Sequence, residues 1–186
     1  MATLRVSLDR FRRPGSGPRQ QSDVLTLPAG PTPLHADLSL ALAADVRVRL
    51  EGDQHRVQAE VRADPDLVQP CARCLEDVHL NVHVLYQEEW WLTGDPPADL
   101  AESDGPVLHR GVTDSVVDIW DGFWQNVALE LPAKVLCTEA CRGLCPVCGT
   151  NRNRAECGCA AESIDPRLAV LAQWPRPKDQ PPTPSR

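Results

Sequence analysis

Cysteine spacing is the feature that most constrains this chain. Six of its eight cysteines fall within residues 137–159, where a Cys-Pro-Val-Cys-Gly turn is followed by a Cys-Gly-Cys pair. Such a turn points two thiolates at one ion, and its proline and glycine favour the tight backbone that exposes amide N–H groups to the sulfurs. The second pair completes a tetrahedral set. The spacing therefore predicts a structural zinc site of the zinc-ribbon type, formed by Cys145, Cys148, Cys157 and Cys159.

The other four cysteines form two further pairs. Cys71 and Cys74 make a C-x-x-C motif of their own, and Cys137 and Cys141 lie just before the ribbon. Two interpretations stay open. The pairs meet in space and form a second four-thiolate zinc site, or Cys71 and Cys74 are buried small hydrophobic residues beside Arg73, as free cysteines often are.

Redox catalysis is the other chemistry that a C-x-x-C motif can carry. A thioredoxin-like site at Cys145 and Cys148 needs a strand before the motif and a long helix after it. The residues that follow are Gly-Thr-Asn-Arg-Asn, which favour turns. The chain also shows no apolar signal segment and no run of about 18 apolar residues. We therefore expect a cytoplasmic protein without a membrane span, in which clustered cysteines bind metal.

Hydrophobic periodicity predicts a mainly antiparallel β domain over residues 34–136. Alternating apolar residues predict a hairpin over residues 45–62 and a long strand over residues 78–91. Three-and-four spacing predicts a packing helix near residues 116–131. The expected fold class is α+β, a mainly antiparallel β meander or barrel-like domain with one or two helices and a small C-terminal cysteine-rich zinc module.

Proline and glycine punctuation predicts the domain boundaries. Residues 1–33 are expected to form a basic, Pro/Gly-rich arm, and residues 93–113 a solvated loop. The zinc module and a short helix are expected over residues 137–174, and a disordered tail over residues 175–186.

Charge is unevenly distributed along the chain. The net charge of −7 argues against a protein that coats nucleic acid by bulk electrostatics. However, residues 1–20 contain five arginines, whereas residues 86–121 contain nine acids and only Arg110. Loops fixed by a metal and rich in arginine suit contacts to RNA phosphates, although ordinary surface arginines are the alternative. The candidate RNA-binding residues are Arg142, Arg152 and Arg154.

The order of these segments resembles the YceD-like family of bacterial and plastid proteins. Four segments carry the resemblance: Cys-Ala-Arg-Cys at 71–74, Val-Asp-Ile at 117–119 before a helix, Gly-Leu-Cys-Pro-Val-Cys-Gly-Thr-Asn at 143–151 and Asp-Pro-Arg-Leu-Ala at 165–169. Together they cover roughly residues 34–172. The sequence departs from the family pattern at Gln125, where an acid is expected, and at Arg152, where an apolar residue is more usual.

The resemblance implies a function. Members of the family are linked to accumulation of the large-subunit ribosomal RNA, and no enzymatic activity is implied. We therefore expect a non-enzymatic ribosome-biogenesis factor that binds large-subunit ribosomal RNA or a precursor particle, with a metal role for the C-terminal cysteines. The charge pattern supports a different hypothesis, an acidic adaptor that holds a basic ribosomal protein or assembly factor through residues 86–121.

Overall fold

The chain forms two compact units in the computed structural model. The first unit comprises Met1–Gly143 and the second Leu144–Arg186. The structure describes residues 3–15, 17–97, 107–159 and 167. The named elements all belong to the first unit and are, in order, β1 (Arg5–Ser7), α1 (Asp9–Arg12), β2 (Arg19–Leu27), β3 (Gly30–Pro31), β4 (Ser39–Leu40), β5 (Ala44–Gly52), β6 (Arg56–Ala63), β7 (Asp66–Pro70), β8 (Asp77–Asn81), β9 (Val84–Trp91), β10 (Val107–Gly111), β11 (Val116–Asp118) and α3 (Trp120–Glu130).

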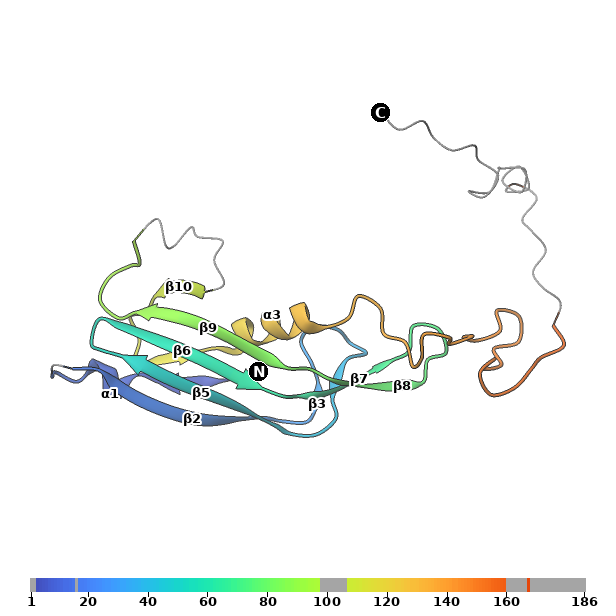
Figure 1. Ribbon diagram of the computed structural model, residues 1–186, viewed down its shortest axis with the longest axis horizontal. Coiled ribbons are helices and arrows are strands. Elements are labelled where there is room, and N and C mark those ends of the chain that lie inside the picture. Colours follow the sequence, from blue (N-terminus) through green and yellow to red (C-terminus); the bar gives the residue numbers. More distant parts are fainter. Residues whose placement is uncertain (1–2, 16, 98–106, 160–166, 168–186) are drawn as a thin grey trace, which may run out of the picture. The chain divides into compact units, whose positions relative to one another are not determined.

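A five-stranded sheet is the centre of the first unit (Figure 1). Its strands lie in the order β10-β9-β6-β5-β2, and every pairing except the parallel β10–β9 pair is antiparallel. Strict alternation gives the sheet one buried face, as Val46, Val48 and Leu50 on β5 show. The predicted hairpin is therefore confirmed as β5 and β6. The carboxylate of Asp53 closes the turn between these strands by accepting the N–H groups of His55 at 2.7 Å and Arg56 at 3.0 Å.

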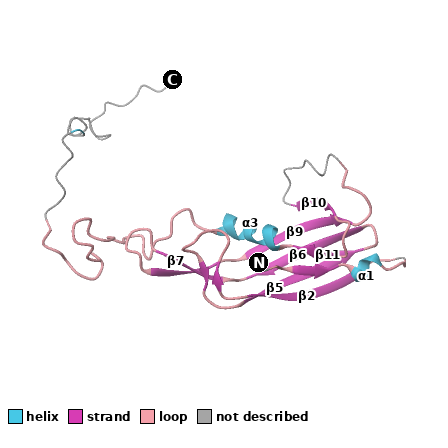
Figure 2. Cartoon of the chain, turned by 180° about the vertical axis from the view of Figure 1, so that it is seen from behind, coloured by secondary structure: helices cyan, strands magenta, loops and turns pink. Residues whose placement is uncertain are grey.

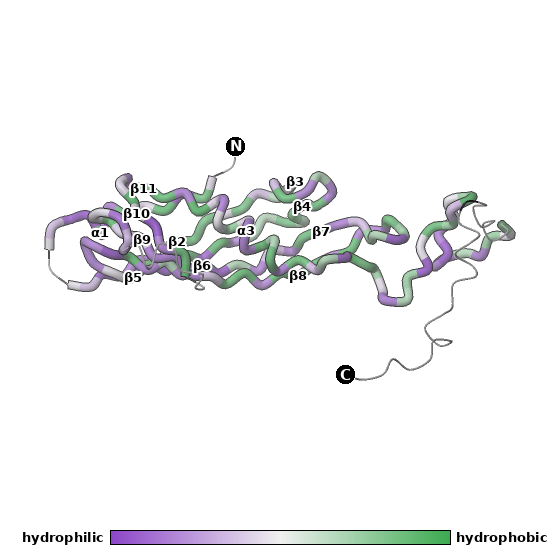
Figure 3. The backbone as a smooth tube through the Cα atoms, turned by 90° about the horizontal axis from the view of Figure 1, so that it is seen from above, coloured by the Kyte–Doolittle hydropathy of each residue, from purple (hydrophilic) through white to green (hydrophobic). Residues whose placement is uncertain are grey.

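A second sheet carries the first C-x-x-C motif. Its strand order is β3-β4-β7-β8, and β7 and β8 form a hairpin whose loop contains Cys71 and Cys74. The predicted single strand over residues 78–91 is two strands, because the chain leaves this sheet after β8 and enters the five-stranded sheet at β9. Between them, Val82 donates its N–H to the carbonyl of Pro65 at 3.2 Å. The same apolar alternation thus serves two sheets, as the burial of alternate residues in β8 and β9 shows. Figure 3 shows hydrophobic and hydrophilic segments alternating along β8.

The N-terminal residues are part of the core, and the prediction of an arm over residues 1–33 is wrong for the described part of that range. Strand β1 pairs with β11, and Leu4, Val6 and Phe11 are buried. Two of the N-terminal arginines are engaged internally. Arg19 donates to the carbonyls of Arg10, Phe11, Arg13 and Gly15, and Arg12 donates to those of Val112 and Asp114. These guanidinium groups satisfy backbone carbonyls that the short elements leave unpaired.

Helix α3 is shorter than the helix expected over residues 116–131. Val116–Asp118 is strand β11, and α3 begins only at Trp120. Phe123 and Val127 are fully buried, and the helix packs along β9 on the buried face of the sheet (Figure 2). Gly122 permits this close approach, because a Cβ atom at that position would lie 2.7 Å from Oε1 of Glu88.

Two further expectations need correction. No closed barrel occurs among the described residues, because the strands divide into three open sheets. The loop expected over residues 93–113 contains β10, which extends the main sheet beside β9. The short helix and tail expected beyond residue 159 lie outside the described residues, apart from Arg167. Within the described part of the chain, none of the helices combines the length and hydrophobicity needed to cross a bilayer.

Candidate metal centres

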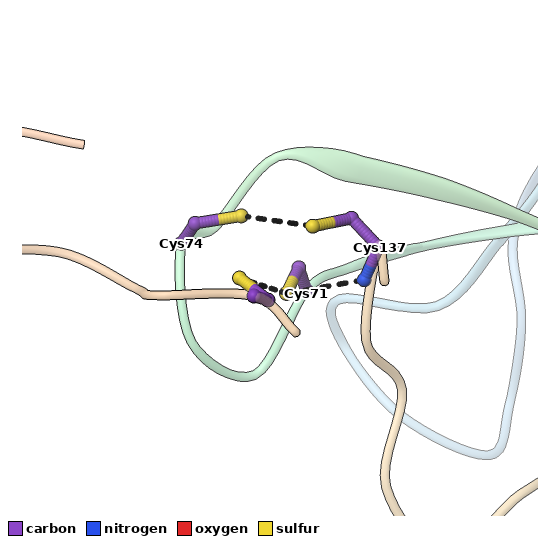
Figure 4. A group of neighbouring side chains, drawn as sticks. Cys71, Cys74 and Cys137 are labelled. Atoms are coloured by element: carbon purple, nitrogen blue, oxygen red, sulfur yellow. Dashed lines mark hydrogen bonds between the residues drawn. The ribbon is translucent and has the colours of Figure 1, made fainter. Parts of the chain in front are cut away.

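Four cysteines from distant segments meet in the first unit. Cys71 and Cys74 lie in the β7–β8 loop, and Cys137 and Cys141 lie after α3. The four sulfur atoms all lie within 4.8 Å of one another. Cys71 Sγ is 3.8 Å from Cys141 Sγ, and Cys74 Sγ is 3.5 Å from Cys137 Sγ (Figure 4). The two cysteine pairs therefore meet in space, as a second four-thiolate site requires. We call this group the first cluster.

The second cluster is the one that the ribbon spacing predicts. Cys145, Cys148, Cys157 and Cys159 bring their sulfur atoms within 4.8 Å of one another in the second unit. The expected boundary at residue 137 is therefore wrong. Cys137 and Cys141 belong to the first unit, and the second unit begins at Leu144.

The sulfur geometry of both clusters fits a tetrahedral metal ion. Zinc–thiolate bonds of about 2.3 Å place the sulfurs of a tetrahedral site about 3.8 Å apart. A disulfide instead needs sulfurs at about 2.05 Å. None of the eight cysteines forms a disulfide. In the first cluster the separations of 3.5 Å and 3.8 Å match the metal geometry, and in the second cluster all four sulfurs lie within 4.8 Å of one another. Each cluster can bind one metal ion.

The two C-x-x-C turns have the same backbone hydrogen bonds. In the first turn, Cys71 donates its N–H to the carbonyl of Glu76 at 2.8 Å, and Leu75 donates to the carbonyl of Cys71 at 3.0 Å. In the second turn, Cys145 donates to Thr150 at 2.8 Å and Gly149 donates to Cys145 at 2.9 Å. Both turns therefore have the same backbone geometry, and we call them knuckles, although only the second has the Pro and Gly signal in its sequence.

A left-handed residue follows each knuckle. Gly149 has φ +73°, a conformation that glycine adopts without strain. Leu75 occupies the equivalent position with φ +61° and is the only non-glycine residue with positive φ among those described. Its side chain is 65% exposed, so packing does not account for the strained backbone. Sequence reasoning missed Leu75, and alignment of the two turns is the signal that identifies it.

Arg73 fixes the first cluster in place. Its Nη1 atom donates to the carbonyls of Glu139 at 3.2 Å and Cys141 at 2.8 Å, which joins the two halves of the cluster. Ala72 adds a backbone bond to the carbonyl of Val135 at 2.9 Å. Gly143 passes close to this loop, because a Cβ atom there would lie 3.0 Å from the carbonyl oxygen of Arg73. Hydrogen bonds and close packing thus join the β7–β8 loop to the segment after α3, on either side of the four sulfurs.

Each cluster contains at least one thiol whose pKa is lowered, and in the second cluster the N–H groups of Cys148 and Val147 also lower the pKa of Cys145. Burial raises the pKa of Cys71, but the N–H groups of Arg73 and Cys137 point at its sulfur and lower the pKa to about 6. The hydroxyl of Thr150, 3.2 Å from Cys148 Sγ, and the N–H of Thr150 lower the pKa of Cys148 to about 6. These two thiolates are the natural first ligands for a cation.

Other thiols of both clusters resist ionisation. The N–H of Glu76 lowers the pKa of Cys74, but burial and the nearby sulfurs outweigh it and raise the pKa to about 12. Hydrogen bonding to Cys148 and burial raise the pKa of Cys159 to about 12. Adjacent thiolates repel one another unless a cation lies between them. Each cluster therefore gains its full negative charge only when a metal ion displaces the protons.

The three arginines predicted to bind RNA are exposed, and the structure divides them between the units. Arg142 follows Cys141 in the first unit, whereas Arg152 and Arg154 lie in the second. Asn151 Oδ1 accepts the N–H of Asn153 at 3.0 Å, and the Asn151 carbonyl accepts the N–H of Arg154 at 3.0 Å. Asn151 thereby closes the turn that exposes the two arginines.

The acidic stretch is partly internal. Glu88 is 2% exposed and lies on the buried face of β9, where its Oε2 atom accepts the N–H of Trp90 at 2.7 Å and pairs with Arg110 at 3.0 Å. Glu89 pairs with Arg56 and with His109. These two acids are therefore engaged within the sheet and are not part of a solvated loop.

Comparison with known proteins identifies relatives. An uncharacterized protein of Mycobacterium tuberculosis is 33% identical over 142 residues, which is 76% of this chain and 66% of that protein. An uncharacterized protein of Mycobacterium leprae is 32% identical over 133 residues, 72% of this chain and 58% of that protein. A chloroplastic protein of Arabidopsis thaliana, the large ribosomal RNA subunit accumulation protein YCED homolog 1, is 37% identical over 58 residues, 31% of this chain and 18% of that protein.

This chain spans less than two thirds of the length of the mycobacterial relatives, 66% of one and 58% of the other. No solved structure matches the chain significantly. The family described as large ribosomal RNA subunit accumulation protein YceD matches residues 57–174. That match includes both knuckles and all eight cysteines. Because it covers more than half of the chain, the protein belongs to the YceD family.

Proposed function

We propose that this protein is a non-enzymatic ribosome-biogenesis factor that promotes the accumulation and maturation of large-subunit ribosomal RNA. The observation that carries the proposal is the family match across both cysteine clusters. The protein would bind the ribosomal RNA or a precursor particle in the cytoplasm. No enzymatic step is needed, because a factor of this kind acts by binding and ordering its target.

The metal in this proposal is zinc, one ion in each cluster. Four thiolates with tetrahedral spacing are the donor set that zinc takes in structural sites. Such a site fills every coordination position with protein and leaves none for a substrate or an activated water. The first cluster would fix the β7–β8 loop to the segment after α3, and the second would order the loop over residues 145–159.

The proposed RNA contacts are made by the three loop arginines, Arg142, Arg152 and Arg154. Their exposed guanidinium groups suit bidentate binding of phosphates. Because Asn151 Oδ1 already accepts a backbone N–H, the Asn151 side chain supports the turn instead of reading a base edge. The proposed contacts are therefore to RNA shape and backbone.

The proposal is tested by crosslinking the tagged protein to RNA in growing cells and sequencing the attached fragments. We expect reads concentrated on large-subunit ribosomal RNA, fewer reads for Cys148→Ser, and fewer for a triple charge reversal of the loop arginines to glutamate. The matched control reverses three exposed arginines away from the clusters, Arg5, Arg13 and Arg47. Equal RNA recovery from both triple variants would overturn the residue assignment. RNA at background level from the parent protein would overturn direct RNA binding.

A further inference from the structure

A cavity of about 720 Å³ lies at the start of α3, far in sequence from both C-x-x-C turns. One part of its lining comes from residues 27–33 and Leu40, and the other comes from Thr3, Asp118 and the first turns of α3. A volume of this size is typical of built ligand sites. The proposed function does not use this cavity.

Two indole rings give the cavity its apolar character. Trp120 and Trp124 both line it, with ring centroids 5.6 Å apart in an edge-to-face arrangement at 68°. Trp124 is 5% exposed, yet its Nε1 atom has no hydrogen-bond partner among the described residues. The hydroxyl of Thr32, which also lines the cavity, likewise has no partner there. Both atoms are themselves buried, so the surface that a ligand meets here is made by the two indole rings.

The backbone of the cavity wall excludes an added β-strand as the ligand. Pro28, Pro31 and Pro33 lack backbone N–H groups, and they include one of the two residues of edge strand β3. A strand docking here would find the row of backbone donors broken at three of the seven positions over residues 27–33, so a continuous hydrogen-bonded ladder could not form. Polyproline II segments need no ladder, and they bind aromatic-lined grooves through ring contacts and through their carbonyl groups.

The charge of the cavity selects a cationic ligand. Asp118 and Asp121 line it, and none of the lining residues is Lys or Arg. Oδ1 of Asp118 accepts the N–H groups of Leu4 at 3.1 Å and Trp120 at 3.0 Å, which fixes this carboxylate beside the indole. A phosphate backbone would be repelled here, whereas an arginine or lysine would pair with the carboxylates. We propose that this cavity binds a proline-containing basic peptide segment of a partner protein, with proline rings against the two tryptophans and a cationic side chain at the two aspartates.

The test titrates the full-length protein, labelled with ¹⁵N, with a synthetic peptide of four Pro-Pro-Arg repeats. We expect saturable shifts of the Trp120 and Trp124 indole N–H signals. Asp121→Lys should weaken binding by about tenfold or more, because it replaces an attraction with a repulsion. Asp114→Lys makes the same charge change at an exposed residue outside this cavity and should change affinity less than about twofold. Neither position is buried, so both variants should fold.

Two further ligands separate the alternatives. A Gly-Gly-Arg repeat peptide has the same charge without proline rings, and a single-stranded RNA oligonucleotide tests nucleic acid at the same site. Any one of three outcomes overturns the proposal. These are no saturable shift with the Pro-Pro-Arg peptide up to about 1 mM, equally tight binding of the Gly-Gly-Arg peptide, and an RNA that shifts the indole signals more strongly than the Pro-Pro-Arg peptide does. The proposal does not depend on RNA binding by the loop arginines, so crosslinking to ribosomal RNA and peptide binding can fail independently.

Discussion

Replacing Gly149 by alanine isolates the energetic role of the left-handed residue in a metal knuckle. A Cβ atom at this position would meet no heavy atom within 4 Å, so the substitution creates no clash. The whole effect comes from the backbone at φ +73°, where an L-residue costs roughly 1–2 kcal/mol. Alanine also restricts the unfolded chain, which offsets about 0.4–1 kcal/mol. A net cost near 1 kcal/mol corresponds to about fivefold weaker zinc binding at the second cluster.

The first cluster offers the reverse substitution. Leu75→Gly removes an unfavourable φ of +61° from the equivalent position, and the lost side chain is largely exposed. We expect zinc affinity at the first cluster to increase by about twofold to fivefold, because glycine adopts this backbone conformation without strain. The gain is limited because glycine also makes the unfolded chain more flexible, which raises the entropy cost of folding. The two variants should therefore move the affinities of the two clusters in opposite directions.

Competition with a chromophoric zinc chelator measures both affinities, and native mass spectrometry counts the ions bound to each variant. Cys137→Ser and Cys148→Ser assign the two binding steps to the first and second clusters. If Gly149→Ala bound zinc as tightly as the parent while Leu75→Gly bound it more weakly, the left-handed position would not control these sites. The inference that the two turns are equivalent knuckles would then be refuted.

Three further predictions concern single sites. Cys137→Ser should leave about one zinc ion per chain in place of two by native mass spectrometry, and a variant that keeps both would remove Cys137 from the ligand set. Arg110→Met should lower the free energy of unfolding in urea by about 2–3 kcal/mol, because it leaves the Glu88 carboxylate buried without its ion pair. A second change, Glu88→Gln, should restore part of the loss. An unchanged urea midpoint for Arg110→Met would contradict this reasoning. The N–H groups of His55 and Arg56 lower the pKa of Asp53, so its contribution to folding stability is present above about pH 4 and is lost as pH falls through the folded pKa. Asp53→Asn should therefore lose less stability than the parent over that pH range. Identical curves of stability against pH for the two proteins would contradict the assignment.

Local signals predicted what depends on short stretches of sequence. The alternation around Val48 and Val61 predicted the β5–β6 hairpin, because both strands and their turn lie within one short segment. The spacing of the ribbon cysteines predicted the second cluster for the same reason. Each of these features is determined by residues that are neighbours in the chain.

Sequence patterns do not predict which distant strands pair with one another. Val6 on β1 pairs with Val117 on β11, more than a hundred residues later, and nothing local to either strand specifies that partner. The prolines that follow β1 favour an arm, although Leu4 and Phe11 are buried in the fold. The sequence pattern places Val116–Asp118 in the helix, because a three-residue strand is too short to show its own period.

The site was predictable to the same extent. Cys71 and Cys74 were identified as a pair, but their partners became clear only when the β7–β8 loop was placed against the segment after α3. Arg73 acts through bonds to carbonyls of Glu139 and Cys141, which a sequence cannot indicate. Leu75 carries a conformation that its residue type argues against.

The separation of the ligands along the chain leads to a last prediction, that the two metal ions have different structural roles. In the first cluster, Cys71 and Cys137 are 66 residues apart and are joined across the fold. In the second, the farthest ligands, Cys145 and Cys159, lie within one short loop of the sequence. The longer loop has the larger closure entropy, by roughly 1.5 kcal/mol from the logarithmic dependence on length, so metal in the first cluster contributes more to global stability.

A graded chelator titration followed by circular dichroism and thermal melting tests this difference. Cys137→Ser keeps only the second ion, and its removal should change the melting temperature little, because the core of the first unit sets that temperature. Cys148→Ser keeps only the first ion, and its removal should lower the melting temperature by more, because the buried residues Cys71, Cys74 and Cys141 lose the ion that they share. Equal shifts on removal of either ion would contradict the argument from chain separation. A larger shift for the second cluster would mean that its loop contributes to the stability of the whole fold.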